Sequence, residues 1–229
     1  MNPVPVIAID GPSGVGKGTV AKALARRLGW HFLDSGSLYR ILALAAQKAG
    51  IPDSEEPAIA ALAPRIDIKF DLEHDDNERI IVDGEDLTSL IRTETTGQLA
   101  SVIAVYPRVR AALLERQRAF RRAPGLVADG RDMGTVVFPD APLKVFLDAT
   151  AEERARRRLN QLSKAGINAK LSNLCAEIRA RDVRDRSRQH SPLKAAGDAV
   201  VIDTTELTVQ AVLSRVEQLV DVRGFATKS

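Results

Sequence analysis

The sequence predicts an α/β protein in which a parallel β-sheet lies between two layers of helices. Helix-like stretches separate five short apolar runs, at residues 4–9, 31–33, 126–128, 143–147 and 200–202. Strands that alternate with helices in this way pair in parallel and are covered on both faces. A glycine-rich loop directly after the first run is the second observation, because ligands of such sheets bind beyond the carboxyl ends of the strands.

The glycine-rich loop reads Gly-Pro-Ser-Gly-Val-Gly-Lys-Gly-Thr, and a helix-like stretch at residues 20–28 follows it. Strand, loop and helix in this order form the setting of a phosphate-binding loop. The glycines let backbone N–H groups approach a polyphosphate, the helix N-terminus adds positive potential, and Lys17 reaches the outer phosphates. We expect this phosphate loop to bind ATP or GTP through Gly11, Pro12, Ser13, Gly14, Val15, Gly16, Lys17, Gly18 and Thr19.

The phosphate loop departs from the general pattern G-x-x-x-x-G-K-[ST] at its last position, where Gly18 precedes the hydroxyl residue Thr19. The hydroxyl normally ligates Mg²⁺, so phosphates, waters and carboxylates elsewhere must hold that ion. We expect Thr19 to hydrogen-bond a phosphate instead. The alternative is an ordinary glycine-rich turn, against which the lysine, the spacing and the flanking elements all argue.

Residues 66–90 interrupt the alternation of strands and helices. Residues 66–70 alternate apolar and polar side chains, residues 79–83 form a second run, and the polar stretch 73–78 between them is typical of a hairpin loop. The sequence therefore predicts a small antiparallel β insertion at about 64–92.

Helices are expected on both sides of the third apolar run. Residues 95–104 and 107–120 lead from the insertion to that run, and Pro107 suits a first helical turn. Apolar residues at helical spacing predict a last helix at 208–222 that closes the sheet.

Length and composition fit a single domain, residues 1–229. With 45% apolar residues the chain can bury one good core. Cys175 is the single cysteine, no apolar run approaches the length that spans a bilayer, and the first residues lack the pattern of a secretory signal. We expect a cytoplasmic monomer that has no membrane partner.

The formal net charge of +3 is unevenly distributed. Residues 154–188 contain 11 Arg or Lys and 3 acids, so this segment carries +8 and the rest of the chain −5. Because the positive charge is confined to one segment, we expect it to bind a compact polyanion and not a long nucleic acid. With 4% aromatic residues few side chains can stack on bases, so we expect no nucleic-acid partner. A nucleic-acid-binding module built on this segment is the alternative, and steeply salt-dependent oligonucleotide binding would favour it.

Two further segments follow the second and third apolar runs, namely Asp-Ser-Gly-Ser-Leu-Tyr-Arg from Asp34 and Asp-Gly-Arg-Asp-Met-Gly-Thr-Val-Val-Phe-Pro-Asp-Ala from Asp129. Together with the phosphate loop, Pro-Arg-Val-Arg from Pro107 and the stretch 179–188, they closely resemble the bacterial-type cytidylate kinases, nearly end to end. The resemblance implies the P-loop NTPase fold, three-layer α/β/α, with a mobile arginine-rich lid at about 152–170. It also implies phosphoryl transfer from ATP to CMP or dCMP, with Mg²⁺ as cofactor.

The resemblance also assigns roles to single residues. Those implied at phosphates are Arg40, Arg131 and Arg188, with Ser35 on the floor of the same site. Asp132 is implied at the cytosine, and Arg181 and Asp185 are implied at the sugar. Cytosine has one amino donor and two acceptors, so a site that recognises it also needs donors, for which Ser101 and Arg110 are the candidates. The implied catalytic charges are Lys17, Arg131, Arg188 and, as the lid residue that touches ATP, Arg157. Asp129 is the candidate that holds Mg²⁺ through water.

Plainer interpretations of these residues stay open at this point. Arg40 alone would be a solvated helix charge, and Arg131 and Asp132 could pair with each other. Arg181, Asp185 and Arg188 share a helical face, where ion pairs often have no catalytic role. Another kind of P-loop enzyme is the remaining rival, although the sequence contains neither an Asn-Lys-x-Asp guanine-reading motif nor a Leu-Ser-Gly-Gly-Gln signature.

Overall fold

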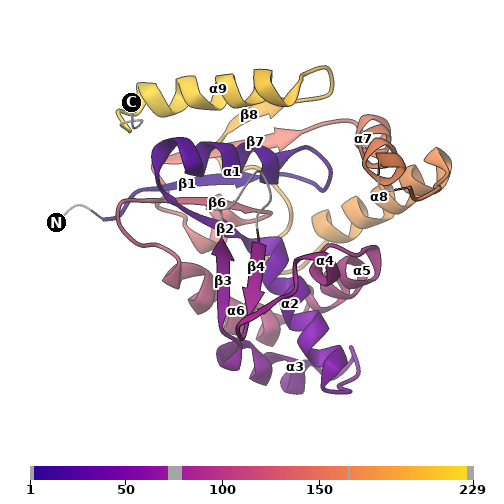
Figure 1. Cartoon of the computed structure of the whole chain (residues 1–229). Coiled ribbons are helices and arrows are strands. Elements are labelled where there is room, and N and C mark those ends of the chain that lie inside the picture. The colour runs from indigo at the N-terminus through magenta and orange to yellow at the C-terminus, as the bar shows by residue number, and fades with distance from the viewer. Residues whose placement is uncertain (1–2, 72–78, 165, 226–229) are drawn as a thin grey trace.

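A computed structural model of the protein describes residues 3–71, 79–164 and 166–225 as three layers, helices on both faces of a central sheet (Figure 1). Within these ranges the central sheet has five parallel strands in the order β2-β6-β1-β7-β8. The strands are β1 Val6–Asp10, β2 His31–Asp34, β6 Leu126–Gly130, β7 Leu143–Asp148 and β8 Val200–Asp203. The fold class predicted from the apolar runs is confirmed, and each strand includes the aspartate that follows its run.

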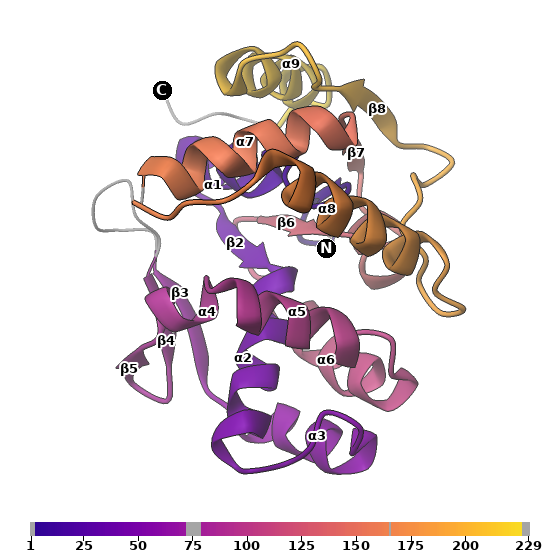
Figure 2. The same ribbon diagram turned by 90° about the vertical axis from the view of Figure 1, so that its right-hand side faces the viewer.

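The two faces of the sheet bury different apolar clusters, because neighbouring residues of a strand point to opposite faces. Val6 and Ala8 of β1 belong to the cluster formed with α2 (Ser35–Lys48) and α6 (Pro107–Ala119). Ile7 and Ile9 belong to the cluster formed with α1 (Lys17–Leu28) and α9 (Val209–Val222). Figures 1 and 2 show α1 and α9 on one side of the sheet and α2, α3 and α6 on the other.

The insertion expected at about 64–92 is a three-stranded antiparallel sheet in the described residues, in the order β3-β4-β5. Its elements are β3 Ile68–Asp71, β4 Arg79–Val82, β5 Glu85–Asp86 and the following α4 Thr88–Ile91. The third strand was not predicted: Gly84, at φ 84°, turns the chain so that two further residues pair with β4. The expected hairpin loop at 73–78 lies outside the described residues.

The remaining helices complete the layers and the lid. They are α3 Glu56–Leu62, α5 Glu94–Ile103, α7 Ala151–Lys164 and α8 Leu171–Arg186, with short helical turns at Ala63–Arg65 and Met133–Val137. The lid expected at about 152–170 coincides with α7 and the chain that leads into α8, apart from residue 165, which is not described. Helices α7 and α8 pack against each other beside the carboxyl ends of the strands (Figure 2). The motion of this lid stays a prediction.

None of the helices in the described part of the chain combines the length and the apolar content needed to cross a bilayer.

Candidate active site

The carboxyl ends of the five strands bring aspartates to one edge of the sheet. Asp34 of β2 pairs in register with Asp129 of β6, and Asp148 of β7 with Asp203 of β8. Asp10 ends β1 directly before the phosphate loop. The site expected at this edge therefore has its scaffold.

The phosphate loop wraps tightly around the end of β1. A Cβ on Gly11, at φ 149°, would lie 2.0 Å from the carbonyl oxygen of Leu147, so only glycine fits there. Lys17 is buried at the first position of α1, and its Nζ donates to the carbonyl oxygen of Pro12 at 2.8 Å. Gly16 is the N-cap of α1 and has no side chain to occupy the N–H groups of the first turn. The loop and this helix end thus present backbone donors and a lysine to an anion.

Lys17 and Asp129 face each other beneath the loop, with Nζ 3.9 Å from Oδ1. Burial raises the pKa of Asp129, and burial followed by the charge of Arg131 lowers the pKa of Lys17. A Cβ on Gly18 would lie 3.2 Å from Oδ2 of Asp129, so the glycine that replaces the usual hydroxyl residue makes room for this carboxylate. The glycine at position 18, where the pattern has a hydroxyl residue, therefore allows Asp129 to lie against the start of α1.

Asp10 ties the phosphate loop to the segment after β6. Its carboxylate accepts hydrogen bonds from the backbone N–H groups of Met133 and Gly134, at 2.8 Å each. Burial raises the pKa of Asp10 to about 6. The carboxylate that precedes the phosphate loop thus holds the residues that directly follow Asp132.

A cavity of about 50 Å³, the acceptor cavity, lies at the same edge of the sheet. Side chains from α2, α5, α6, the chain after β6, and α8 with the residues that follow it converge on this acceptor cavity. All nine residues expected to bind the acceptor line it, namely Ser35, Arg40, Ser101, Arg110, Arg131, Asp132, Arg181, Asp185 and Arg188. Residues far apart in the sequence therefore meet in one cavity, and their contacts with an acceptor stay predictions.

Asp185 lines the acceptor cavity and is surrounded by arginines. Its side chain is 1% exposed and lies 3.2 Å from Nε of Arg131, 3.9 Å from Nε of Arg181 and beside Nη2 of Arg188. Burial alone would raise the pKa of Asp185, but these charges hold it below its usual value. Burial, with the charge of Arg131, also lowers the pKa of Arg181 to about 10. Three guanidinium groups against one carboxylate leave an excess of positive charge, which suits an anion.

The shape of this arginine cluster differs in one respect from the expected helical face. Helix α8 ends at Arg186, so Arg188 lies beyond the helix and still reaches Asp185. Arg131 joins the cluster from another element, so the ion pairs are not confined to one helical face, and their role in binding the acceptor stays a prediction.

A second group of polar side chains lines the acceptor cavity. Asp132 pairs with Nη2 of Arg110, whose Nη1 donates to the carbonyl oxygen of Ala104 at 3.2 Å. Ser101 is 4% exposed, and its hydroxyl has no hydrogen-bond partner among the described residues. The alternative in which Arg131 and Asp132 pair with each other is wrong, since each has a different partner. The carboxylate of Asp132, the guanidinium of Arg110 and the unpaired hydroxyl of Ser101 can thus form hydrogen bonds with a polar ring.

Two residues that support the acceptor cavity were not predicted. Gln117 is 2% exposed and donates from Nε2 to Oγ of Ser35 at 3.2 Å. A Cβ on Gly97 would lie 2.6 Å from Nη2 of Arg40, so this glycine makes room for the guanidinium. Gln117 follows Val109 and Leu113 on the buried face of α6, and a glutamine on an apolar helical face is a signal that could have revealed it.

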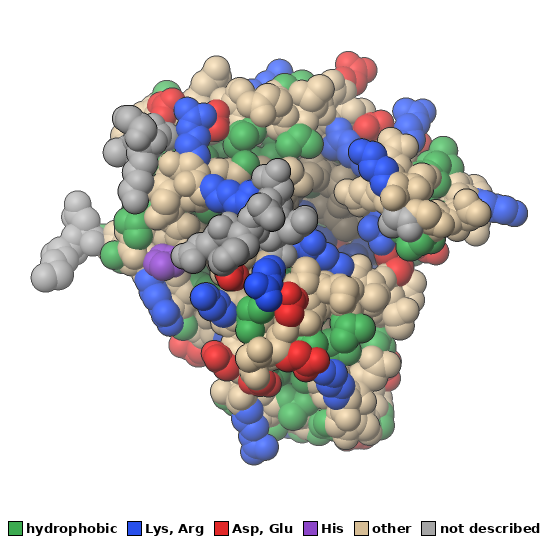
Figure 3. Space-filling model, viewed as in Figure 1, with side chains coloured by type: hydrophobic (Ala, Val, Ile, Leu, Met, Phe, Trp, Pro, Cys, Tyr) green, Lys and Arg blue, Asp and Glu red, His purple; other side chains and the backbone are tan. Residues whose placement is uncertain are grey.

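The lid arginines line a larger cavity of about 540 Å³ between the phosphate loop, α5, α7 and α8. Figure 3 shows Lys and Arg side chains gathered around a hollow beside the α7–α8 pair. Arg157, the expected ATP contact, donates to Oγ1 of Thr204 at 3.1 Å and to the carbonyl oxygen of Val15 at 3.4 Å. Arg158 instead reaches Glu94 on α5 at 2.7 Å. The contact of Arg157 with ATP stays a prediction.

A phosphate loop that shares one sheet edge with an arginine-lined acceptor cavity defines a P-loop kinase of a small anionic substrate. The family model described as cytidylate kinase matches residues 7–222, and the chain belongs to the cytidylate kinase family.

Curated relatives agree with this family over nearly their whole length. A cytidylate kinase of Pseudomonas entomophila (strain L48) is 58% identical over 222 residues, which cover 96% of this chain and 97% of the relative. A cytidylate kinase of Stutzerimonas stutzeri (strain A1501) is 56% identical over 227 residues, 99% of each chain. Among solved structures, an unliganded sugar kinase of Janibacter sp. HTCC2649 is 17% identical with a TM-score of 0.47, and the match covers 99% of this chain and 100% of that one.

Proposed function

We propose that the protein transfers the γ-phosphoryl group of ATP to CMP or dCMP, giving CDP or dCDP and ADP, in pyrimidine nucleotide metabolism. The observation that carries the proposal is the acceptor cavity, which is lined both by the arginine cluster around Asp185 and by the pair Asp132 and Arg110, and which shares lining residues with the larger cavity beside the phosphate loop. A nucleoside monophosphate has the matching groups, with charge on its phosphate and hydrogen-bonding groups on its base. The phosphate loop at the same sheet edge accommodates the donor.

The proposed chemistry depends on position and charge. Phosphoryl transfer needs two phosphates in line, water excluded and negative charge neutralised. Lys17 would serve the phosphates of ATP, and Arg131 lies close enough to influence Lys17 while it also contacts Asp185 in the acceptor cavity. Arg131 therefore stands between the two sites, and Arg188 adds charge on the acceptor side. A closed lid with Arg157 would keep the reacting phosphate from water.

The residues near the phosphate loop fit Mg²⁺ bound together with ATP. No cluster of three or more His, Cys, Asp or Glu within the described ranges could hold a metal by protein groups alone. Asp129 is buried beneath the loop, and Asp34 and Asp10 nearby further raise its pKa, so this region favours a cation. When bound, Mg²⁺ supplies positive charge to the phosphate oxygens, and we propose that Asp129 holds it through water.

Base selection would follow from Asp132, Arg110 and Ser101, which line the acceptor cavity. Cytosine has an amino donor beside two acceptors, so the carboxylate of Asp132 can accept from the amino group while Arg110 and Ser101 donate. Uracil presents a carbonyl where cytosine has its amino group, so Asp132 would face an oxygen. Mismatched buried polar groups discriminate strongly between such substrates.

The arginines of the positive segment have partners that argue against a nucleic-acid track. Arg154 pairs with Asp182, and Arg158 pairs with Glu94. Charges held by carboxylates of the same chain are less available to a phosphate backbone. We propose that the active unit is a monomer, because one chain supplies every predicted site residue, and that it works in the cytoplasm, where its single cysteine would stay reduced.

The test is an ADP-release assay with ATP and Mg²⁺ against CMP, dCMP, UMP, AMP and GMP. The proposal predicts the highest kcat/KM for CMP or dCMP. As a control, Lys17→Ala should retain the fold and lose orders of magnitude in turnover, because the lysine serves charge that develops during transfer. A preference for AMP or GMP would refute the proposed acceptor, and a folded Lys17→Ala protein with normal turnover would refute the assignment of the phosphate loop.

A further inference from the structure

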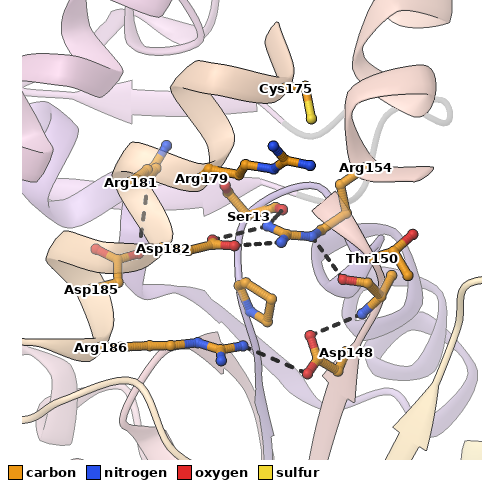
Figure 4. Close-up of polar contacts among 12 residues, drawn as sticks. Ser13, Asp148, Thr150, Arg154, Cys175, Arg179, Arg181, Asp182, Asp185 and Arg186 are labelled. Atoms are coloured by element: carbon orange, nitrogen blue, oxygen red, sulfur yellow. Dashed lines mark hydrogen bonds and ion pairs between the residues drawn. The ribbon is translucent and has the colours of Figure 1, made fainter. Parts of the chain in front are cut away.

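Arg154, the first arginine of the lid, is buried and connects three segments (Figure 4). Its Nε donates to the carbonyl oxygen of Ala149 at 3.0 Å, at the end of β7, and its Nη1 to that of Ser13 at 3.2 Å, in the phosphate loop. The guanidinium also forms a two-point pair with Asp182 of α8, with Nη1 2.9 Å from Oδ1 and Nη2 beside Oδ2. One planar group thus joins the sheet, the donor loop and a lid helix.

The contact of Arg154 with the phosphate loop is tight. A Cβ on Gly14 would lie 3.2 Å from the Cβ of Arg154, so the loop passes directly over the base of this side chain. The side chains of Arg154 and Asp182 are 3% and 15% exposed. Little water can replace either partner, so the pair holds a defined geometry.

Helix α8 carries Asp182 next to residues of the acceptor cavity. Arg181 precedes Asp182, and Asp185 is one helical turn further on; both line the acceptor cavity. A shift of Asp182 therefore moves the residues that are expected to hold the sugar and the phosphate of the acceptor.

Two other ion pairs fix α8 without reaching the phosphate loop. Arg179 pairs with Glu152 of α7. Arg186 lies 3.7 Å from Asp148 of β7 (Figure 4). All four side chains are more than a third exposed. These pairs supply controls on the same helix.

We propose that Arg154 and Asp182 form a positioning pair that couples the binding of ATP at the phosphate loop to the binding of the acceptor nucleotide at α8. When ATP fills the phosphate loop, it fixes the position of the Ser13 carbonyl, to which Arg154 donates. Arg154 in turn fixes Asp182, and with it Arg181 and Asp185 on the same helix. The inference rests on the proposed function, since it takes ATP and CMP as the two ligands. Coupling between binding sites is reciprocal, so CMP must strengthen ATP binding by the same factor.

Calorimetric titration of CMP, with and without a non-hydrolysable ATP analogue, measures this coupling directly. In the wild type the analogue should strengthen CMP binding about 10-fold, within the usual range of coupling between sites. Asp182→Asn should reduce this factor below about 2-fold and leave the affinity for CMP alone within about 3-fold of the wild type, because the acceptor residues remain. Arg179→Gln and Arg186→Gln should retain the full factor.

A second variant and a fold measurement keep the test decisive. Arg154→Lys retains a positive charge but cannot contact Ser13 and both oxygens of Asp182 at once, so it should also lose the coupling. Near-ultraviolet circular dichroism identifies the folded variants, and a folded variant of either residue suffices. Full coupling in a folded Asp182→Asn or Arg154→Lys protein would overturn the inference, as would a wild type without coupling. A wild type that binds the ATP analogue but not CMP would instead refute the proposed acceptor, and the inference with it.

Discussion

The unpaired hydroxyl of Ser101 leads to a prediction in which stability and binding change in opposite directions. The side chain is buried in the acceptor cavity, and its oxygen has no hydrogen-bond partner among the described residues. A buried polar group without a partner costs about 1–3 kcal/mol of stability. Ser101→Ala removes that group and leaves its methylene carbon in place.

The expected sizes follow from this geometry. In the absence of nucleotide, the free energy of unfolding of Ser101→Ala should equal that of the wild type or exceed it by up to about 3 kcal/mol. A neutral hydrogen bond from the hydroxyl to the cytosine would contribute about 0.5–1.5 kcal/mol, so kcat/KM for CMP should fall about 2- to 10-fold. Most of the loss should be in KM, because the base does not change during transfer.

Urea denaturation and the ADP-release assay measure the two quantities on the same protein samples. Thr95→Ala is a matched control, because Thr95 is an exposed hydroxyl residue on the same helix, α5, and should change neither quantity. If Ser101→Ala lost more than about 1 kcal/mol of stability while kcat/KM stayed unchanged, the hydroxyl would have a structural partner and the reasoning would fail.

Three further outcomes test other parts of the site. Asp132→Asn should lose much of its activity toward CMP and narrow the ratio of kcat/KM between CMP and UMP, since an amide can donate to the uracil carbonyl; an unchanged ratio would remove Asp132 from base reading. Arg188→Ala should lower kcat more than it raises KM for CMP, because a charge near the lid acts most strongly in the closed state, and a pure KM effect would place Arg188 in ground-state binding. Because burial raises the pKa of Asp10 to about 6, its contribution to stability is greatest below about pH 4 and is lost as the pH rises through 6. The stability of the wild type relative to Asp10→Asn should therefore fall by about 2 kcal/mol between pH 4 and pH 7 in urea denaturation, and a constant difference would contradict the raised pKa of the buried carboxyl.

The sequence predicted the elements that depend on local pattern. Five apolar runs that end at aspartates specified the sheet, and the spacing of glycines around Lys17 specified the phosphate loop. The acceptor residues came from resemblance, because nothing local places Ser101 of α5 beside Asp185 of α8. That proximity depends on how α5 and α8 are held over the sheet edge.

The sequence could not predict which lid arginine is buried, which is exposed and which partner each one contacts. Arg154, Arg156, Arg157 and Arg158 are similar in type and nearly adjacent, so only their direction on α7 separates them. The structure turns Arg154 to the inside, leaves Arg156 with a side chain 67% exposed, and fixes Arg157 to the segment after β8. The partners that decide these roles come from α8 and β8, which lie well beyond a local sequence window.

The alternation of side chains along β1 separates the interior into two compartments. Val6 and Ala8 pack in the apolar core formed with α2 and α6, and Ile7 and Ile9 pack in the core formed with α1 and α9. The sheet therefore separates two apolar cores, while polar links such as Asp10 and the Arg154–Asp182 pair connect the two sites. Substitutions on opposite sides of such a partition should add with little interaction. Apolar residues of one core can therefore be repacked with little effect on the other core, so the stability of the two halves can be tuned separately while the polar links between the sites are retained.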